Sequence, residues 1–314
     1  MLSVDDFMPS EGRCAQTLRE LRWRGGVLCP FCGSRRVTKQ GRHLGVYQRY
    51  VCKACGSWFN DKTGTLFFNS KLSLRRWFFA ALLMDLNAPT TRISEVLRVT
   101  YKTALRITKG LRRSIYIEDV VERLKGVVEV DETYLKAGLK GRQDLRRPPR
   151  SRALRRRGRG TYRGDKPPIM AMVQRRPRRL LLEPTLDMDS KRLLRRLARR
   201  VVWGSTLYTD GFKAYQPLEG GYIHGWVEHG VEWGRDGVHT NTAEGEFSVF
   251  KPWMATYRGV CKRYLYLYCN HYQFTRNHQN LGTIGRLHKT IKKIDSQPDH
   301  QGITHHKTTA TCYT

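Results

Sequence analysis

The sequence predicts an α/β domain preceded by a small cysteine-rich module and a helical module. Three observations support this division: two Cys-x-x-Cys pairs within residues 29–55, helical patterns between residues 73 and 116, and alternating strand and helix patterns after Gly126. Strands that alternate with helices are typical of a mixed α/β sheet. The expected parts are residues 1–65 (an N-terminal helix and the cysteine-rich module), 66–122 (the helical module), 123–281 (the α/β domain) and 282–314 (a tail expected to be disordered).

The two N-terminal modules are expected to consist of short elements. Residues 10–24 form a helical pattern with Ser10 as N-cap, and short strands are expected around the cysteine pairs up to residue 59. Residues 73–86 are apolar at helical spacing until Asn87-Ala88-Pro89, where the helix should end because proline cannot continue it. Two further helices are expected at residues 91–97 and 101–116.

The α/β domain opens with residues 127–131, whose β-branched side chains are typical of a central strand. Further strands are expected at residues 169–173, 180–186 and 206–209, and helices at residues 190–201, 242–254 and 262–276. Between the first two strands lies a basic insertion at residues 142–163, and its segment 146–163 contains nine arginines and no carboxylate. This segment is interpreted either as a clamp on a polyanion or as a solvated linker.

The charge of the chain predicts its class of partner. Lys and Arg total 58 against 27 Asp and Glu among 314 residues, which gives a formal net charge of +31. A chain this basic repels itself unless a polyanion neutralises it, and nucleic acid is the commonest such partner. The longest apolar run, residues 77–84, is too short for a bilayer that needs about 20 residues, and the N-terminus lacks the features of a secretory signal. A cytoplasmic protein that binds nucleic acid is therefore expected.

Four of the eight cysteines form two pairs, Cys29 with Cys32 and Cys52 with Cys55, separated by 19 residues. Zn²⁺ prefers four soft ligands at the corners of a tetrahedron, and each Cys-x-x-Cys turn presents two thiolates at that spacing. A glycine follows each pair and lets the backbone turn. The four cysteines are therefore predicted to hold a structural zinc ion in a zinc ribbon, and two redox pairs are the alternative interpretation.

The two helices at residues 91–97 and 101–116 are joined by only three residues, which fits a helix-turn-helix that binds DNA. The residues expected to face DNA are Thr100, Tyr101, Lys102, Thr103 and Arg106. Those expected to pack inward are Ala104, Leu105, Ile107 and Thr108. A plain helical bundle that links two domains is the alternative.

Two aspartates end predicted strands of the α/β domain, Asp131 in VVEVD and Asp210 in TLYTD. Carboxylates at the carboxyl ends of strands occupy a ligand-binding position in α/β sheets. Glu129 shares a strand face with Asp131 and is a rival ligand, whereas Glu132 is expected to point to the other side. Two such aspartates, followed by a glutamate on a downstream helix, indicate a phosphoryl-transfer site.

The downstream helix supplies Glu244. At 3.6 residues per turn, one stripe of this helix contains Asn241, Glu244, Ser248 and Lys251. Glu246 lies about 200° around the helix from Glu244 and is expected to face elsewhere.

The order of these modules, together with VEVDETY, LYTDGFKAY and HTNTAEGEFSVFK, resembles zinc-ribbon DDE transposases of insertion sequences. More narrowly, it resembles the Merlin-related group with an ISXO-like catalytic domain, over residues 7–280. This resemblance implies a ribonuclease H-like catalytic domain. It also implies that the partners are DNA, at the terminal inverted repeats of the element and at the target, and further copies of the chain bound to that DNA.

The resemblance also implies the roles of the site residues. Asp131, Asp210 and Glu244 match the acidic triad, and the separation of 34 positions from Asp210 to Glu244 fits the short spacing of the family. Lys251 matches the lysine seven residues after the third acid. Members vary between Asn and Glu as third ligand, and Asn241 shares a face with Glu244. Glu244 is preferred because a carboxylate neutralises Mg²⁺ better than an amide does.

The implied reaction is phosphodiester displacement with two Mg²⁺ ions, for which Mn²⁺ can substitute. Asp131 would bind both ions, Asp210 one and Glu244 the other, while Lys251 and His239 contact phosphate. Water would free a 3′-hydroxyl at the element end, and that hydroxyl would then attack target DNA. A DNA-binding regulator and a ribonuclease H-like nuclease are the alternatives: a regulator only binds, a nuclease only cuts, and a transposase joins ends.

Overall fold

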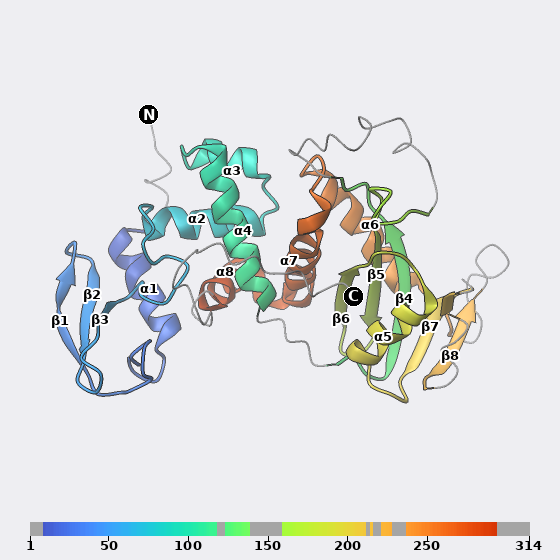
Figure 1. Cartoon of the computed structure of the whole chain (residues 1–314), viewed down its shortest axis with the longest axis horizontal. Helices are drawn as coiled ribbons and strands as arrows, with labels where there is room; N and C mark the ends of the chain where they lie inside the picture. The colour runs from blue at the N-terminus through green and yellow to red at the C-terminus, as the bar shows by residue number, and fades with distance from the viewer. Residues whose placement is uncertain are drawn as a thin grey trace. The chain divides into compact units, whose positions relative to one another are not determined.

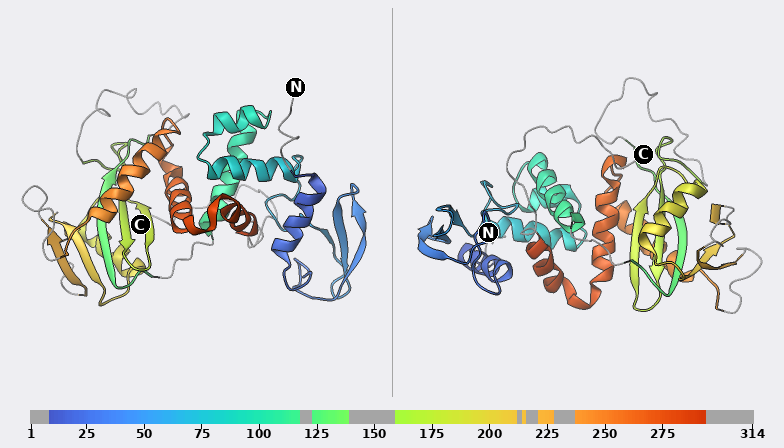
Figure 2. Two further views of the ribbon diagram at one scale, coloured as in Figure 1. Left: turned by 180° about the vertical axis from the view of Figure 1, so that it is seen from behind. Right: turned by 60° about the horizontal axis from the view of Figure 1, so that its bottom comes forward.

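The computed structural model describes residues 9–117, 123–138, 159–211, 214–215, 221–227 and 237–293 (Figures 1 and 2). These residues divide into two compact units. The first contains residues 9–86, 91–117 and 283–293, and the second contains residues 87–90 together with the described residues between 123 and 282. In the part of the chain that the structure describes, no helix is long and apolar enough to cross a membrane.

The first unit begins with helix α1 (Glu11–Arg22) followed by a small antiparallel sheet. Its strands, in spatial order, are β1 (Val37–His43), β2 (Tyr47–Cys52) and β3 (Trp58–Asn60). The predicted N-cap is confirmed, because the Ser10 side chain accepts a hydrogen bond from the Arg13 amide. Asp61 is fully buried and accepts from the Arg19 guanidinium at 2.7 and 3.0 Å and from the Gln48 amide at 2.7 Å. This carboxylate ties α1 to the sheet.

The helical module of the first unit contains α2 (Leu74–Asp85), α3 (Thr90–Val96) and α4 (Tyr101–Ile117). The three helices confirm the predicted ones to within a residue or two. The Glu11 carboxylate accepts hydrogen bonds from the amides of Leu74 and Arg75 at 2.7 and 3.0 Å. An acid in the first turn of α1 therefore caps the positive end of α2 and joins the two predicted modules.

One predicted packing contact of α4 is wrong. Ala104, Ile107 and Thr108 are buried as expected, but Leu105 is 39% exposed. The buried stripe continues through Leu111 and Ile115 at spacings of three and four residues. Leu105 lies about 100° around the helix from Ala104, on the side facing water.

The tail expected to be disordered is in part a helix. Residues Gly282–Lys293 form α8, and residues 294–314 lie outside the described residues. The Arg286 guanidinium makes two hydrogen bonds of 2.8 Å to the Asp85 carboxylate at the end of α2, and both side chains are largely buried. Ile291 is also buried. A paired cation and few apolar residues anchor α8, which explains why its sparse apolar pattern did not predict it.

The second unit is a five-stranded sheet with helices on both faces, and its mixed strand directions agree with the predicted mixed α/β sheet. The strands are β4 (Val127–Tyr134), β5 (Pro168–Gln174), β6 (Arg179–Pro184), β7 (Thr206–Asp210) and β8 (Ile223–Val227), in the spatial order β6-β5-β4-β7-β8. β5 is antiparallel to its two neighbours β4 and β6, whereas β7 is parallel to β4 and to β8. β8 was not predicted, because its five residues IHGWV include a glycine and show no alternating pattern.

Two apolar cores cover the two faces of this sheet. On one face, residues of β5 and β6 pack against α6 (Asn241–Ala255) and α7 (Leu265–Asn277), and α7 follows the short 3₁₀ helix η4 (Lys262–Tyr264). On the other face, β4 and β5 pack against Leu193 and Leu197 of α5 (Ser190–Arg200). Figures 1 and 2 show the sheet between these helices. A second 3₁₀ helix, η5 (Gln279–Leu281), follows α7.

The outer edge of β6 is bonded by side chains of α7. The Leu182 amide donates to the Gln273 side-chain oxygen at 3.0 Å. Asn277 accepts from the Leu180 amide at 2.8 Å and donates to the Leu180 carbonyl at 2.9 Å. Backbone groups that an edge strand leaves unpaired are thus satisfied at this edge.

The turn between α3 and α4 generates a stability prediction. The Val99 amide bonds to the Ser94 carbonyl and the Arg98 amide to the Glu95 carbonyl, which is the hydrogen-bond pattern of a Schellman motif. Its left-handed position, which favours glycine, is occupied by Arg98 at φ +49°.

Arg98→Gly is therefore expected to stabilise the first unit by about 0.5–1 kcal/mol, raising its melting temperature by a few degrees. Arg98→Ala removes the guanidinium but keeps the strained Cβ atom, so it serves as the control and should not stabilise. Thermal denaturation followed by circular dichroism compares the two variants. Equal melting temperatures for the Arg98→Gly and Arg98→Ala variants would contradict the inference that the backbone at position 98 is strained.

Candidate functional site

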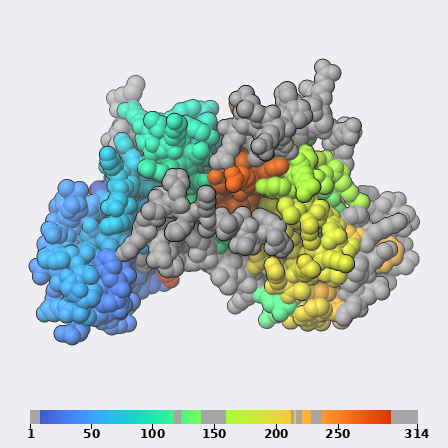
Figure 3. Space-filling model, in the orientation of Figure 1, coloured from blue at the N-terminus to red at the C-terminus, as the bar shows by residue number. Residues whose placement is uncertain are grey.

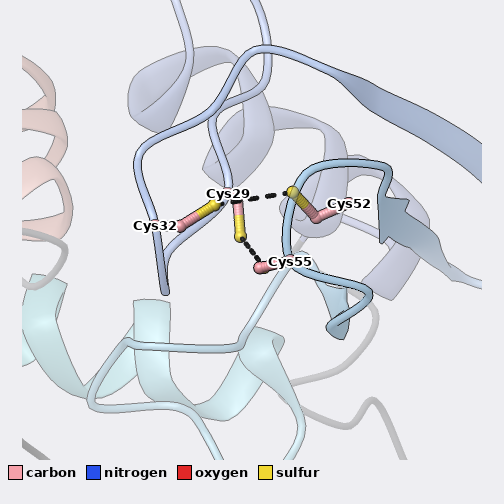
Figure 4. A group of neighbouring side chains, drawn as sticks. All are labelled: Cys29, Cys32, Cys52 and Cys55. Carbon is pink, nitrogen blue, oxygen red and sulfur yellow. Dashed lines mark hydrogen bonds between the residues drawn. The ribbon is translucent and has the colours of Figure 1, made fainter.

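The four cysteines of the two Cys-x-x-Cys pairs form one cluster (Figure 4). Their sulfur atoms all lie within 4.8 Å of one another, with 3.7 Å between Cys29 and Cys55 and 3.6 Å between Cys32 and Cys52. Four sulfurs placed tetrahedrally about 2.3 Å from a zinc ion lie about 3.8 Å apart. The cluster therefore has the ligand type and spacing of a structural zinc site.

The two halves of the cluster repeat one backbone geometry. The Gly33 amide donates to the Cys29 carbonyl and the Gly56 amide to the Cys52 carbonyl, both at 2.9 Å. The two glycines have φ +71° and +72°, a backbone region that residues other than glycine rarely adopt. The predicted need for a glycine after each pair is thus met at both turns.

The surroundings of the second pair favour thiolates, the form that binds metal. Ser57, whose Oγ lies 3.3 Å from the sulfur, lowers the pKa of Cys55 to about 6. The pKa of Cys52 is also lowered, chiefly by the backbone amide of Cys55. Both shifts help zinc to compete with protons for these sulfurs near neutral pH.

The two predicted metal-binding aspartates lie on neighbouring parallel strands. Glu129 of β4 pairs with Tyr208 of β7, and the same register carried two residues further places Asp131 beside Asp210. Each aspartate lies two residues beyond that pair, so both side chains start from the same face of the sheet. Their oxygens lie within 4.8 Å of each other, in a cluster that Glu132 completes. Strand pairing thus brings two of the three predicted ligands together.

The presence of Glu132 in this cluster corrects the expectation that its side chain stays on the other side of the strand. Glu132 pairs with Met170, which belongs to the core beneath α5, so its backbone position is on that face as predicted. The side chain is only 4% exposed, however, and its carboxylate reaches the aspartates. The Tyr215 hydroxyl donates to it at 2.9 Å, and Arg159 lies 4.0 Å away. A glutamate is long enough for its carboxylate to reach the aspartates, and the hydrogen bond from Tyr215 holds it there.

The predicted stripe on α6 is confirmed. Its members are all exposed on one side of the helix: Asn241, Glu244, Ser248 and Lys251. Glu246 faces the interior and accepts hydrogen bonds from Arg178 at 2.6 Å, Arg276 at 2.9 Å and the Tyr272 hydroxyl at 3.0 Å. These partners hold the pKa of Glu246 below its ordinary value despite burial, so it remains a structural anion.

Glu244 stands close to the aspartate pair without belonging to the cluster of three. Its carboxylate accepts a hydrogen bond from the Thr240 hydroxyl at 3.2 Å. Its charge contributes to the raised pKa of Asp131, which places it within electrostatic reach of that residue. The structure thus surrounds Asp131 with three further carboxylates, of which the sequence predicts two as ligands.

Glu129 is fully buried and caps α6. Its carboxylate accepts from the amides of Thr242 and Ala243 at 2.8 and 3.0 Å, from the Thr242 hydroxyl at 2.7 Å and from Arg175 Nε at 2.7 Å. Glu129, which the sequence offers as a rival metal ligand, therefore already accepts hydrogen bonds from four donors. Because Glu129 precedes Asp131 by two residues, the cap fixes the start of the helix that carries Glu244 against the strand that carries Asp131.

Arg175, which the sequence analysis did not single out, extends this connection. Besides Glu129, its guanidinium donates to the carbonyls of Gly237 and His239 at 3.1 and 3.0 Å, and it lies 4.7 Å above the Tyr208 ring. One residue at the end of β5 thereby contacts β4, β7 and the segment that leads into α6. The imidazole of His239, predicted to contact phosphate, lies 2.9 Å from the same guanidinium.

The carboxylates alter the acidity of Asp131. Burial chiefly, and then the charges of Glu132, Asp210 and Glu244, raise the pKa of Asp131 from 3.8 to about 7, although the Glu132 amide donates to Asp131 at 2.7 Å. A divalent cation would offset the repulsion that adds to the effect of burial on this pKa. Carboxylates crowded in this way fit a site for Mg²⁺, which prefers oxygen ligands.

Asp131→Asn is expected to stabilise the metal-free protein above pH 7. Between about pH 4 and 7 the folded state keeps the Asp131 proton that the unfolded state has released, so wild-type stability falls as pH rises. The Asn variant lacks this loss, which amounts to about 1.4 kcal/mol per unit of pKa shift. Melting curves in EDTA at pH 4.5 and pH 8 provide the measurement. A stability difference that does not grow with pH would contradict the raised pKa.

Comparison with known proteins gives concordant results for the two clusters. Residues 123–277, which include the carboxylates, match the model of the ISXO2-like transposase domain, and residues 9–57 match the transposase zinc-ribbon domain. The chain is 39% identical over 280 residues to a protein of Halobacterium salinarum described as "Uncharacterized protein in transposable element ISH50". That alignment covers 88% of this chain and 94% of the relative.

Solved structures resemble the chain only distantly. A chain of the simian T-cell lymphotropic virus intasome in complex with PP2A regulatory subunit B56 gamma aligns at 14% identity and a TM-score of 0.32, covering 73% of this chain and 78% of that one. A chain of the pre-cleavage Mos1 transpososome aligns at 12% identity and a TM-score of 0.20, covering 71% and 79%. These scores are too low to support an argument about the fold. The two domain models and the relative in ISH50 show that the chain belongs to the transposase family that combines a zinc-ribbon domain with an ISXO2-like transposase domain.

Proposed function

We propose that this transposase is a DDE enzyme that binds the ends of an insertion sequence and catalyses Mg²⁺-dependent DNA cleavage and strand transfer. The observation that carries the proposal is the placement of Asp131 beside Asp210, with Glu132 and Glu244 close by. Carboxylates that lie together on two neighbouring strands are suited to phosphoryl transfer with two metal ions. Water would first free a 3′-hydroxyl at the element end, and that hydroxyl would then attack a phosphodiester of the target.

The fold is consistent with this chemistry. Three antiparallel strands followed by two parallel ones, with helices on both faces, is the arrangement proposed here as ribonuclease H-like. Asp131 lies on the central strand β4 and Asp210 on its parallel neighbour β7. Glu244 lies on α6, whose start is bonded to β4 through Glu129. Three separate elements thus converge on one point of the sheet.

The proposed ligands of the catalytic Mg²⁺ ions are Asp131, Asp210 and Glu244. Bound there, two such ions would activate the attacking oxygen and stabilise the leaving one. The chain's own contribution is to hold three carboxylates in a fixed relation. It also offers Lys251, which is exposed on α6 two turns after Glu244, to a phosphate. Asn241 occupies the same face one turn earlier and is the alternative third ligand.

Glu132 adds a candidate that sequence reasoning set aside. It lies in the cluster with both aspartates, but Tyr215 and Arg159 already contact its carboxylate. Glu244 is exposed on the same helix face as Lys251, whereas the Glu132 side chain is only 4% exposed and is held by the Tyr215 hydroxyl. We therefore keep Glu244 as the third ligand and assign Glu132 to orienting the aspartates.

DNA recognition is assigned to the first unit. Tyr101, Lys102 and Arg106 are exposed at the start of α4, and the Schellman turn separates this helix sharply from α3. This exposure supports a helix-turn-helix in which α4 reads base edges. The zinc ribbon adds further basic residues to this unit. A regulator that only binds DNA would account for these modules but not for the carboxylates of the second unit.

Substituting the ligands should separate binding from chemistry. Asp131→Ala, Asp210→Ala and Glu244→Ala should each lower cleavage and strand transfer by more than about a hundredfold, beyond the usual effect of residues that only orient ligands. Binding to element ends should persist, because the DNA-reading surface is elsewhere. Cleavage and joining of a labelled end fragment, with gel-shift binding in parallel, provide the measurement.

Glu132→Gln is the matched comparison for Glu244→Gln. An orienting role for Glu132 predicts a loss of about tenfold to a hundredfold, smaller than the loss at Glu244. An active Glu244→Gln variant beside an inactive Glu132→Gln variant would transfer the third-ligand role to Glu132. Full activity after substitution of either aspartate would remove that residue from the site.

Zinc should be stoichiometric and structural. The purified chain is expected to contain about one zinc per molecule, and Cys29→Ser or Cys55→Ser should release it and unfold the ribbon. End binding should weaken while the second unit keeps its own melting transition. Cys14→Ser changes a buried thiol outside the cluster and should retain the metal. Metal analysis by atomic absorption decides the matter, and zinc-free wild-type protein would overturn the assignment.

A further inference from the structure

Helix α5 presents a row of cations that the carboxylate site does not use. The helix contains six basic residues and no acidic one. Three of the six form ion pairs within the unit: Arg192 bonds to Asp187 at 2.7 Å, and Arg196 and Arg200 share Glu183. Burial of Leu193 and Leu197 against the sheet fixes which side of the helix faces outward.

The other three cations form a ridge on the outward side. Lys191, Arg195 and Arg199 are exposed at successive spacings of four residues, which separates them by about 6 Å along the helix. Among the residues that the structure describes, none of the three takes part in an ion pair. Like charges four residues apart destabilise a helix slightly, so the ridge favours an anionic partner. Figure 3 shows α5, in yellow, on the surface of the second unit.

A fixed aromatic ring lies just beyond this ridge. Trp203 follows Arg199 by four residues, a reach of at most about 14 Å along the chain, and is 58% exposed. Its ring stacks on the largely buried Tyr222, with 5.2 Å between centroids and 7° between planes. A Cβ atom at Gly221 would lie 1.6 Å from the Trp203 ring, so only glycine leaves room for this stack. The indole is therefore held in place while much of its surface remains open.

We propose that Lys191, Arg195, Arg199 and Trp203 form a binding surface for single-stranded DNA. Cations that follow the backbone, combined with aromatic rings on which bases stack, are the means by which proteins bind single strands. A base can stack on an indole only when it is free of its own duplex, which favours a strand over a duplex. The surface lies on the α5 side of the sheet, opposite α6 and Glu244, so it goes beyond the proposed catalytic site and does not depend on it.

The test measures binding by the full chain in EDTA, where cleavage cannot interfere. A fluorescent thymidine oligonucleotide of about 12 nucleotides is titrated at several salt concentrations, alongside a duplex of equal length. The variant K191Q/R195Q/R199Q should lower the slope of log affinity against log salt for the single strand by about 2, because each of the three lost phosphate contacts accounts for about 0.7 of that slope. Trp203→Ala should weaken single-strand binding roughly fivefold to a hundredfold and leave the slope unchanged.

Two controls separate this surface from general effects. K191R/R195K/R199K keeps the charges and should keep the wild-type slope. Trp226→Ala removes a tryptophan that is equally exposed, at 58%, but lies on β8 away from α5, and it should leave affinity unchanged. All four variants alter exposed side chains, and their melting temperatures verify folding.

Several outcomes would overturn the proposal. It fails if the glutamine variant keeps the wild-type slope, or if Trp203→Ala binds the single strand as tightly as Trp226→Ala does. Equal losses on single strand and duplex in the glutamine variant, with no effect of Trp203→Ala, would identify a duplex-backbone surface instead. None of these results depends on whether Asp131, Asp210 and Glu244 perform the chemistry.

Discussion

The second unit depends on one buried anion. Glu129 has no exposure to water, and a carboxylate in that position would be costly if it lacked partners. The chain supplies them from two directions: backbone amides and a hydroxyl at the start of α6, and the guanidinium of Arg175 at the end of β5. Because the helix amides also carry the positive end of the helix dipole, this arrangement satisfies the charge and orients the helix together. The spacing between Asp131 and Glu244 follows from that connection.

The same anion explains why crowded carboxylates can be tolerated nearby. Asp131 and Glu132 of β4 lie close enough to Asp210 of β7 to repel it when all are ionised, and that repulsion opposes the pairing of the two strands. A rigid frame resists it, as the four donors on Glu129 and the further contacts of Arg175 with Gly237, His239 and Tyr208 indicate. The repulsion at Asp131 lowers the stability of the unit, and the hydrogen bonds to Glu129, two residues earlier on β4, raise it. Such local cost, compensated by the surrounding structure, is common at functional sites.

Much of the architecture could be predicted because its signals are local. Ser10, the Cys-x-x-Cys spacing and the glycines after each pair depend on a few neighbouring residues, and the structure agrees with all three. The helical stripe of α6 and the inward position of Glu246 follow from a period of 3.6 residues. Asp131 and Asp210 could be matched because each follows an apolar strand segment; Asp210 does end β7, whereas β4 continues beyond Asp131 to Tyr134. Local sequence patterns were thus sufficient to predict the fold class and to identify two of the carboxylates.

What could not be predicted depends on contacts between distant segments. α8 is anchored by Arg286 on Asp85, about two hundred residues apart in the sequence. Glu132 reaches the aspartates because Tyr215, from a different segment, bonds to it. Arg175 follows β5 without any motif of its own, and its importance appears only when β4, β7 and α6 surround it. Strand β8 is too short and too irregular to show a period at all.

The contacts between α7 and β6 show how a helix can take the place of a neighbouring strand, and where that substitution must end. Two residues along a strand advance about 6.6 Å, and four residues along a helix advance about 6.0 Å. The two repeats nearly coincide, so Gln273 and Asn277 meet Leu182 and Leu180 in turn. Each step of four residues also turns the side chain about 40° around the helix axis. A third amide in the series would point away from the strand, and α7 ends at Asn277. The mismatch between two periods thus limits this sheet border to two rungs.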